Sequence, residues 1–135
     1  MSTQSLPSRA AVVIIGGGMV GMTMAKAATD LGLTTAMLEP SPASITLAPE
    51  HDGRASAIAF ATSRMLDALG VWRHVAHEAS PIEDIMITDG KRRGMTSSMH
   101  IHFDHRDIGD TPLGHIVENR HMRMALQKAL EDAGH

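Results

Sequence analysis

The sequence predicts an α/β protein that opens with a strand, a helix and a second strand and builds a mainly parallel sheet. A short β-branched run is followed by a glycine-rich turn, an alanine- and methionine-rich segment of helical length, and another apolar run. The composition is that of an ordinary globular domain, with 43% hydrophobic and 20% charged residues. A chain of 135 residues is long enough to enclose one modest core.

The first three elements have the spacing of a βαβ unit. Residues Ala10–Ile15 form a continuous apolar run, which is typical of a strand buried on both faces. Residues Met19–Leu31 contain one breaker, Gly21, and predict a helix that Gly32 ends. Residues Leu33–Glu39 predict the second strand. Because a single helix joins the two strands, we expect them to run parallel.

A glycine motif lies between the first strand and the helix. Gly16, Gly18 and Gly21 satisfy the pattern G-x-G-x-x-G in the strand-to-helix context that it requires. We expect Gly16 to permit the tight turn, Gly18 to let the backbone approach a pyrophosphate, and Gly21 to let the helix pack closely on the strand. The first helical residues, Met19 and Val20, would offer N–H groups and the positive end of the helix dipole to the phosphates.

An acidic residue completes this nucleotide-binding pattern. Glu39 ends the second predicted strand, about twenty residues after the glycines. Its carboxylate can accept hydrogen bonds from the hydroxyls of an adenosine ribose and would repel a 2′-phosphate. The Rossmann-like unit therefore fits FAD or NAD and disfavours NADP, and the residues of the unit leave the choice between FAD and NAD open.

The middle of the chain predicts a loop followed by helices. Residues Pro40–Asp52 contain three prolines and little periodicity, so we expect a loop. Residues Ala55–Leu69 predict a helix with a buried apolar stripe that includes Ile58, and Gly70 ends it. Residues Val71–Ala79 predict a further short helix.

The last third alternates between strands and turns before a final helix. Residues Ile82–Thr88 and Met99–Phe103 predict strands, and Asp89-Gly90 predicts the turn between them. A loop at 111–114, a strand at His115–Glu118 and a helix at Met122–Ala133 follow. We expect residues 1–9 to be a disordered lead, 10–135 to be one domain, and 82–114 to be an inserted β segment that begins a substrate domain. An α/β chain should continue with a strand after its last helix, so the sequence predicts a truncated protein.

Composition excludes several classes of function. Cysteine is absent, which excludes disulfides, thiolate catalysis and cysteine-ligated zinc. Aromatic residues are 2% of the chain and no dense basic stripe occurs, so we expect no nucleic-acid partner. The first residues lack the pattern of a signal peptide, and the apolar run near them is too short to span a bilayer. We therefore expect a cytoplasmic protein.

Other polar clusters have ordinary explanations. His100 and His102 share one face of a predicted strand and His105 follows, but a solvated face explains this spacing better than a metal site, and we expect no metal. The acids at 83, 84, 104 and 107 fit a polar surface better than a catalytic pair. Residues 91–93 form a short basic run at an exposed tip, where a membrane or partner contact is the alternative. Ser56 and Ser63 lack the context of a hydrolase nucleophile.

Four stretches resemble one family of enzymes. Residues 52–59 read Asp-Gly-Arg-Ala-Ser-Ala-Ile-Ala, and such a segment after the second strand resembles the single-component flavin aromatic hydroxylases, in particular the ubiquinone-biosynthesis branch. The segments GGGMVG at 16–21, LDALGVW at 66–72 and GHIVEN at 114–119 resemble segments of the same branch. This resemblance covers nearly the whole chain.

The resemblance implies FAD as the cofactor and assigns residues to it. Arg54 matches the arginine that reaches the phosphate and ribityl side of the flavin, a role for which a forked guanidinium is suited. Arg123 stands where many relatives place another arginine that contacts FAD. The glycines would then hold the FAD pyrophosphate, and Glu39 would hold its ribose.

The resemblance also implies a reaction. Such an enzyme hydroxylates the phenolic ring of a polyprenylated ubiquinone precursor with NAD(P)H and O₂, so the partners would be a phenol or quinol substrate, the inner-membrane surface and a ubiquinone-biosynthesis complex. The catalytic residues are unknown, and we expect this piece alone to be inactive. The alternatives are another FAD-dependent oxidoreductase, such as an amine oxidase or halogenase, or a non-catalytic nucleotide-binding domain.

Overall fold

The computed structural model describes residues 9–41, 53–91 and 95–134. The chain opens with strand β1 (Val12–Ile15), helix α1 (Met19–Asp30) and strand β2 (Thr35–Leu38). The two strands pair in parallel, with Val12 opposite Thr35 and Ile15 opposite Leu38. The predicted βαβ opening is therefore confirmed, and Gly32 follows the helix in a left-handed conformation, with φ at +74°.

The segment after Gly53 differs from the predicted helix. Residues Ala55–Ala59 form strand β3, and the helix α3 spans only Phe60–Ala68. The prediction of one helix from Ala55 was wrong because the small residues at 55–59 alternate between exposed and half-buried positions and pair along a neighbouring strand. Ile58 consequently packs on the core from a strand and not from the helical stripe.

The predicted short helix at 71–79 is replaced by two 3₁₀ turns. They span Trp72–His74 and Ala76–Glu78, and the first of them follows Gly70, whose φ is +69°. Strand β4 (Ser80–Ile82) comes directly after them. Val71 and Val75 have no exposed surface, so the turns bury one valine before each of them.

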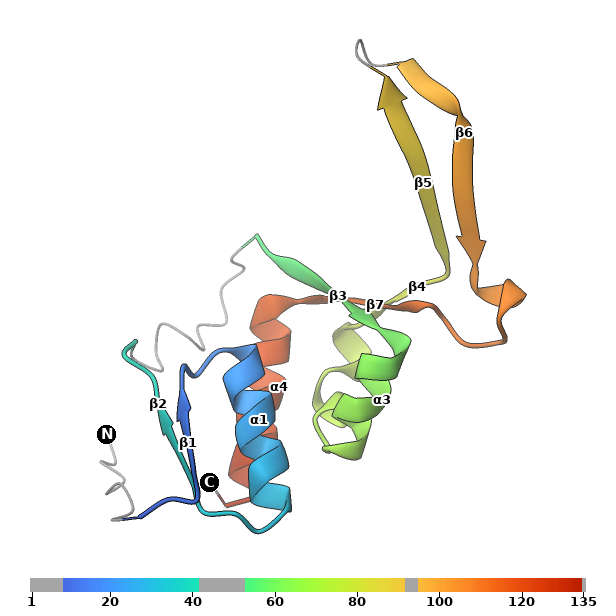
Figure 1. Cartoon of the computed structure of the whole chain (residues 1–135). Coiled ribbons are helices and arrows are strands. Elements are labelled where there is room, and N and C mark those ends of the chain that lie inside the picture. The colour runs from blue at the N-terminus through green and yellow to red at the C-terminus, as the bar shows by residue number, and fades with distance from the viewer. Residues whose placement is uncertain (1–8, 42–52, 92–94, 135) are drawn as a thin grey trace.

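A long hairpin occupies the middle of the predicted β segment. Strand β5 spans Asp84–Lys91 and β6 spans Met95–Asp104. Asp89-Gly90 does not form the turn between them, because β5 continues through it to Lys91, which pairs with Met95; the ladder is irregular between Thr88 and Gly90. The hairpin projects away from the helices (Figure 1). Whether it opens a separate substrate domain stays a prediction.

The chain then returns to the body of the molecule. A 3₁₀ turn (His105–Asp107) leads to strand β7 (Gly114–Glu118), and helix α4 (Asn119–Asp132) follows at once. The helix begins three residues earlier than predicted. Strand β7 lies between β3 and β4 and is antiparallel to both. Within the described residues, parallel pairing is confined to β1 and β2.

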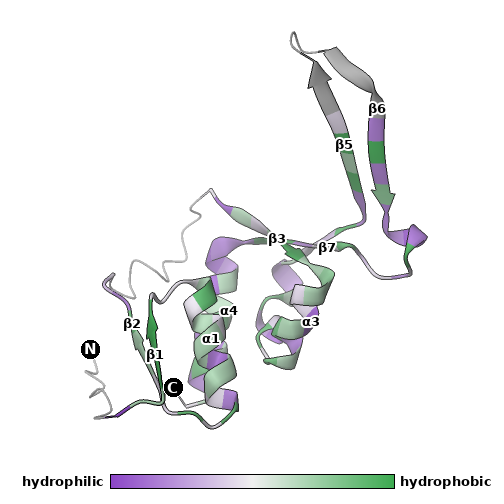
Figure 2. Cartoon of the chain, in the orientation of Figure 1, coloured by the Kyte–Doolittle hydropathy of each residue, from purple (hydrophilic) through white to green (hydrophobic). Residues whose placement is uncertain are grey.

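The core lies where three helices meet beneath the β3–β7–β4 sheet. Helix α1 packs on α4, with α3 beside them and β1–β2 on the outer side of α1 (Figure 1). Both hydrophobic and hydrophilic residues occur on each of the helices (Figure 2). The most deeply buried side chains are Met22 on α1, Val117 on β7, Leu126 on α4, and Val71 and Val75 beside the two 3₁₀ turns.

Candidate cofactor site

The glycine turn after β1 has two positions that exclude larger residues, one through its backbone conformation and one through a close contact. The φ angle of Gly16 is +106°, and its N–H donates to the Leu38 carbonyl at 2.8 Å. A Cβ atom at position 21 would stand 1.9 Å from the Gly16 carbonyl oxygen. Position 16 thus requires glycine because of its left-handed backbone, and position 21 because the helix approaches the turn so closely.

Gly18 has a different environment. It precedes α1 with an extended backbone, and a Cβ built on it would meet no described atom within 4 Å. No described side chain caps the helix at this end. The first N–H groups of α1, including those of Met19 and Val20, therefore face an open space, which suits an anionic group at a helix N-terminus.

Glu39 follows β2 and is tied to the same turn. Its Oε2 accepts a hydrogen bond from the Gly17 N–H at 2.6 Å, and its Oε1 accepts one from the Ser41 N–H at 2.9 Å. These two backbone donors, Ser41 first and Gly17 second, lower the pKa of the Glu39 carboxyl below its ordinary value of 4.5. The side chain is exposed, so an ionised hydrogen-bond acceptor stands at the mouth of the turn at neutral pH.

Gly17 occupies a variable position of the G-x-G-x-x-G pattern, but in the structure it contacts Glu39. Besides its hydrogen bond to Glu39, a Cβ at position 17 would lie 2.9 Å from the Glu39 Cβ. A side chain there would push the carboxylate away. The run of three glycines in the sequence was the signal that could have found it.

The two arginines lie on different elements. Arg54 is exposed directly before β3, and its carbonyl accepts a hydrogen bond from the Asn119 N–H at 3.0 Å. Arg123 is half-buried on α4, one turn after Asn119. Ser56 donates to the Asn119 Oδ1 at 2.6 Å, a contact that the sequence did not suggest. Asp52 lies outside the described residues.

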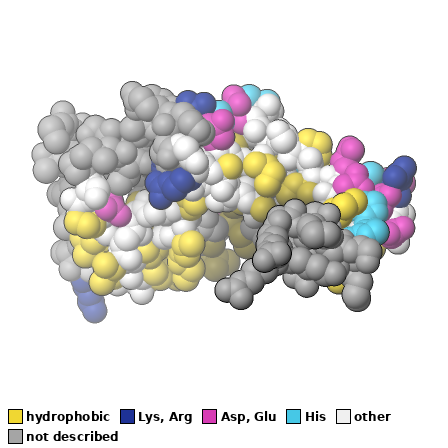
Figure 3. Space-filling model, turned by 90° about the horizontal axis from the view of Figure 1, so that it is seen from above, with side chains coloured by type: hydrophobic (Ala, Val, Ile, Leu, Met, Phe, Trp, Pro, Cys, Tyr) yellow, Lys and Arg dark blue, Asp and Glu magenta, His cyan; other side chains and the backbone are white. Residues whose placement is uncertain are grey.

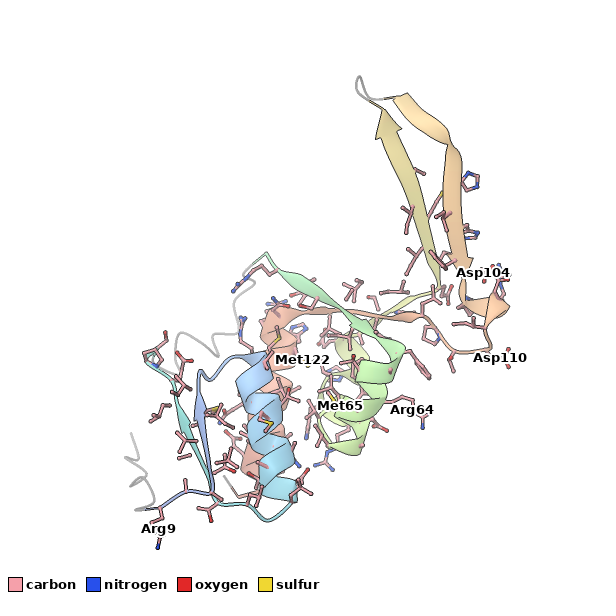
Figure 4. The ribbon with its side chains drawn as sticks, viewed as in Figure 1. Arg9, Arg64, Met65, Asp104, Asp110 and Met122 are labelled. Carbon is pink, nitrogen blue, oxygen red and sulfur yellow. The ribbon has the colours of Figure 1, made fainter. Side chains whose placement is uncertain are left out.

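An apolar cleft of about 560 Å³ adjoins the site. Its walls come from the first half of α1, from β3, from α3 and from α4. Met65 and Met122 point into the region between the helices, whereas Arg64 points away from it (Figure 4). Met19, Val20 and Ser56 all line this cleft, so the first turn of α1 and the start of β3 border the same space.

The polar clusters on the hairpin have partners of their own. His102 lies 2.8 Å from the Asp84 carboxylate, and the His105 ring lies 3.1 Å from the Glu83 carbonyl. Arg106 binds Asp104 through both of its carboxylate oxygens and lowers the pKa of that carboxyl well below its ordinary value. Histidine and acidic side chains gather at the hairpin end of the molecule (Figure 3). No group of three metal-binding side chains occurs in the described parts of the chain.

Three further predictions concern Ser63, the basic run and membrane-spanning segments. Ser63 is buried in α3 and donates to the Phe60 carbonyl at 2.8 Å, so it has a structural partner. Arg92 and Arg93 of the basic run lie outside the described residues. None of the helices described for residues 9–134 has the length and apolar character needed to cross a membrane.

Comparison with known families identifies the cofactor of this fold. A family model described as the FAD binding domain matches residues 9–132. The chain belongs to this family. The choice between FAD and NAD that the βαβ residues left open is thereby resolved in favour of FAD, and the uncapped helix, the open space at Gly18 and the ionised Glu39 fit that cofactor.

Among curated proteins, ubiquinone hydroxylase UbiL of Rhodospirillum rubrum is 37% identical over 124 residues, which are 92% of this chain and 28% of the relative. The 3-demethoxyubiquinol 3-hydroxylase of Escherichia coli is 32% identical over 122 residues, or 89% of this chain and 30% of the relative. The chain therefore spans less than a third of the length of these relatives.

Solved structures share the fold. The p-nitrophenol 4-monooxygenase PnpA from Pseudomonas putida DLL-E4 matches with a TM-score of 0.68 at 22% identity, over 90% of this chain and 29% of that one. The flavin-dependent monooxygenase PieE, solved with FAD and substrate, matches with a TM-score of 0.65 at 18% identity, over 96% of this chain and 23% of that one. The predicted α/β FAD-binding fold is confirmed.

Proposed function

We propose that this chain is the FAD-binding part of a monooxygenase that hydroxylates the phenolic ring of a polyprenylated ubiquinone precursor. The observation that carries the proposal is its 37% and 32% identity to two hydroxylases named for ubiquinone and demethoxyubiquinol, over about nine tenths of the chain. When bound, FAD supplies the redox chemistry: it takes electrons from NAD(P)H and passes them to O₂.

The residues of this chain bind and orient the cofactor. The N–H groups at the start of α1 bind the pyrophosphate at the open side of Gly18, where no described side chain competes for them. Glu39 accepts hydrogen bonds from the adenosine ribose, since the donors from Gly17 and Ser41 keep it ionised and in place. Arg54 donates to the phosphate and ribityl side, and Arg123 supports the cofactor from α4.

The surroundings of the reaction belong to the same proposal. A polyprenylated substrate partitions into lipid, so the protein would work in the cytoplasm at the surface of the inner membrane. The basic run at 91–93 of the sequence would interact there with anionic head groups. Association with other ubiquinone-biosynthesis enzymes would then pass the lipid substrate between them.

The test places residues 9–132 in the corresponding position of the Rhodospirillum rubrum hydroxylase. The purified fusion protein is assayed for bound FAD by its visible absorbance, for NADH and NADPH oxidation, and for a product 16 mass units heavier than an added polyprenylphenol. We expect bound flavin, substrate-stimulated oxidation of one nicotinamide and the heavier product. The same fusion with Gly18→Val is the control and should lose the flavin.

Two results would contradict the proposal at different levels. A fusion that binds FAD and consumes NAD(P)H but releases only hydrogen peroxide, with no heavier product, would contradict the hydroxylation of this substrate and leave the FAD assignment standing. A folded fusion without flavin would contradict the assignment of the cofactor residues themselves.

A further inference from the structure

Asn119, the first residue of α4, is hydrogen-bonded to the start of β3 and to the residue before it. Its backbone N–H donates to the Arg54 carbonyl at 3.0 Å, and its side-chain Oδ1 accepts from the Ser56 hydroxyl at 2.6 Å. The side-chain contact joins residues 63 positions apart in the sequence. One asparagine thus holds β3 on both sides of Ala55.

This contact lies where the regular pairing of β3 ends. The β3–β7 ladder runs from Ala59 opposite Gly114 to Ala55 opposite Glu118, and Arg54 lies beyond its last pair. Gly53, with φ at +73°, precedes Arg54 and leaves the backbone free to turn. Asn119 therefore extends the constraint of the sheet by one residue, to Arg54.

The place of this contact gives it a functional meaning. Ser56 lines the same cleft as Met19 and Val20, the residues whose N–H groups start α1. Any shift of the start of β3 therefore moves Arg54 relative to the N-terminal end of α1. A guanidinium serves a phosphate best when its direction is fixed, because its donors form a rigid fork.

We propose that Asn119 is a positioning residue for FAD binding, which holds Arg54 in register with the cofactor site through the Ser56 hydroxyl and the Arg54 carbonyl. The inference rests on the role of Arg54 in FAD binding given under the proposed function. It assigns no contact between Asn119 and the cofactor.

A double-mutant cycle separates this role from a purely structural one. Dissociation constants for FAD are measured by flavin fluorescence for the chain with Asn119→Ala, Arg54→Ala and both changes. We expect Asn119→Ala to weaken FAD binding by about five- to tenfold, the size of one lost hydrogen bond, and to have no further effect once Arg54 is alanine. Additive losses would overturn the proposal.

Gln127→Ala is the matched control. It removes an amide from the same helix. The Nε2 of Gln127 donates to Glu131 Oε1 at 3.1 Å, two turns further along α4 from Asn119. It should leave FAD affinity within about twofold of the wild type. If Gln127→Ala weakened FAD binding as much as Asn119→Ala, the effect would come from loss of helix stability and the proposal would be wrong. Melting temperatures of both variants provide the comparison.

A second measurement needs no cofactor. Trypsin cleaves after Arg54, and the fragment that begins at Ala55 is counted by mass spectrometry over time. We expect Asn119→Ala and Ser56→Ala to speed this cleavage about fivefold and Gln127→Ala to leave it unchanged. An unchanged rate in Asn119→Ala would overturn the proposal. Neither measurement uses substrate or NAD(P)H, so failure of the hydroxylase assignment gives a different result from failure of this inference.

Discussion

At the scale of single residues, Gly18 and Gly21 belong to one motif but are needed for different reasons. Gly21 is fixed by the protein itself, because a Cβ there would collide with the Gly16 carbonyl. Gly18 has open space around it, so its small size matters only when a ligand occupies that space. The two positions therefore separate stability from cofactor binding.

Alanine at each position should show this separation. We expect Gly21→Ala to lower the free energy of unfolding by about 3 kcal/mol or more, because backbone atoms must move. Gly18→Ala should cost about 1 kcal/mol at most, the usual effect of alanine before a helix, and weaken FAD binding at least about tenfold. Urea denaturation and FAD titration measure the two effects. Equal loss of stability in both variants would contradict the assignment.

Glu39 makes FAD binding dependent on pH in the acidic range. Its folded-state pKa lies below 4.5, so its contribution to stability and to ribose binding is complete above pH 4.5 and is lost as the pH falls through the lowered pKa. We expect the FAD dissociation constant to rise below pH 4.5 in the wild type. Glu39→Gln should bind FAD more weakly at pH 7 and lose this acidic dependence. Profiles with the same acidic dependence in the wild type and in Glu39→Gln would contradict the prediction.

At the scale of elements, α4 carries much of the core. Its residues Met122, Ala125, Leu126 and Leu130 are all nearly inaccessible, and the helix packs along α1. Because α1 begins at the cofactor turn, this packing fixes the direction in which the uncapped end of α1 points. The helix thus links the core to the cofactor site.

Truncation of one α4 side chain should measure this packing. Leu126 is 1% exposed, and we expect Leu126→Ala to lower the free energy of unfolding by about 2–5 kcal/mol. Met124 on the same helix is 37% exposed, so Met124→Ala should cost less than about 1 kcal/mol. Chemical denaturation of both variants is the measurement. Similar losses for the two would show that α4 is not packed as described.

The elements also show which parts of the fold can be predicted from sequence. The βαβ unit was predictable because its pattern is local: apolar runs, a glycine motif and an acid at fixed spacing. Strand β3 was not, since its alanines favour a helix when considered alone and the segment becomes a strand only by pairing with β7 some sixty residues later. The Ser56–Asn119 contact was missed for the same reason.

The hairpin illustrates a second limit. Asp-Gly is a strong local signal for a tight turn, yet here it lies inside β5 next to an irregular step of the ladder. The pairing of Ile85 with Phe103 and of Ile87 with Ile101 fixes a register that carries the strand past Gly90. Apolar cross-strand pairs therefore outweighed the local turn signal.

At the scale of the whole molecule, the hairpin is attached at one narrow point. The Leu113 N–H donates to the Ile82 carbonyl at 2.9 Å, and Ile82 pairs with Gly114 in the adjoining ladder. Both ends of the segment between them leave the body side by side. The hairpin itself extends away from the helices and from the β1–β2 strands (Figure 1).

Removal of this segment should leave the cofactor site intact. We expect a chain in which residues 83–112 are replaced by Asn-Gly to fold and to bind FAD within about twofold of the wild type, because sites far apart act independently. Circular dichroism and FAD titration test this. A shortened chain that is unfolded, or that has lost FAD affinity by more than tenfold, would show that the hairpin supports the body.

The single hydrogen-bonded root of the hairpin has an evolutionary consequence. Mutations that lengthen, shorten or replace the hairpin change only residues between Ile82 and Leu113. The backbone of β7 and α4, which follows, keeps its position. The hairpin can therefore vary between related proteins while the residues of the cofactor site stay the same. Mutations in the hairpin and mutations in the cofactor site therefore fall in separate stretches of the gene.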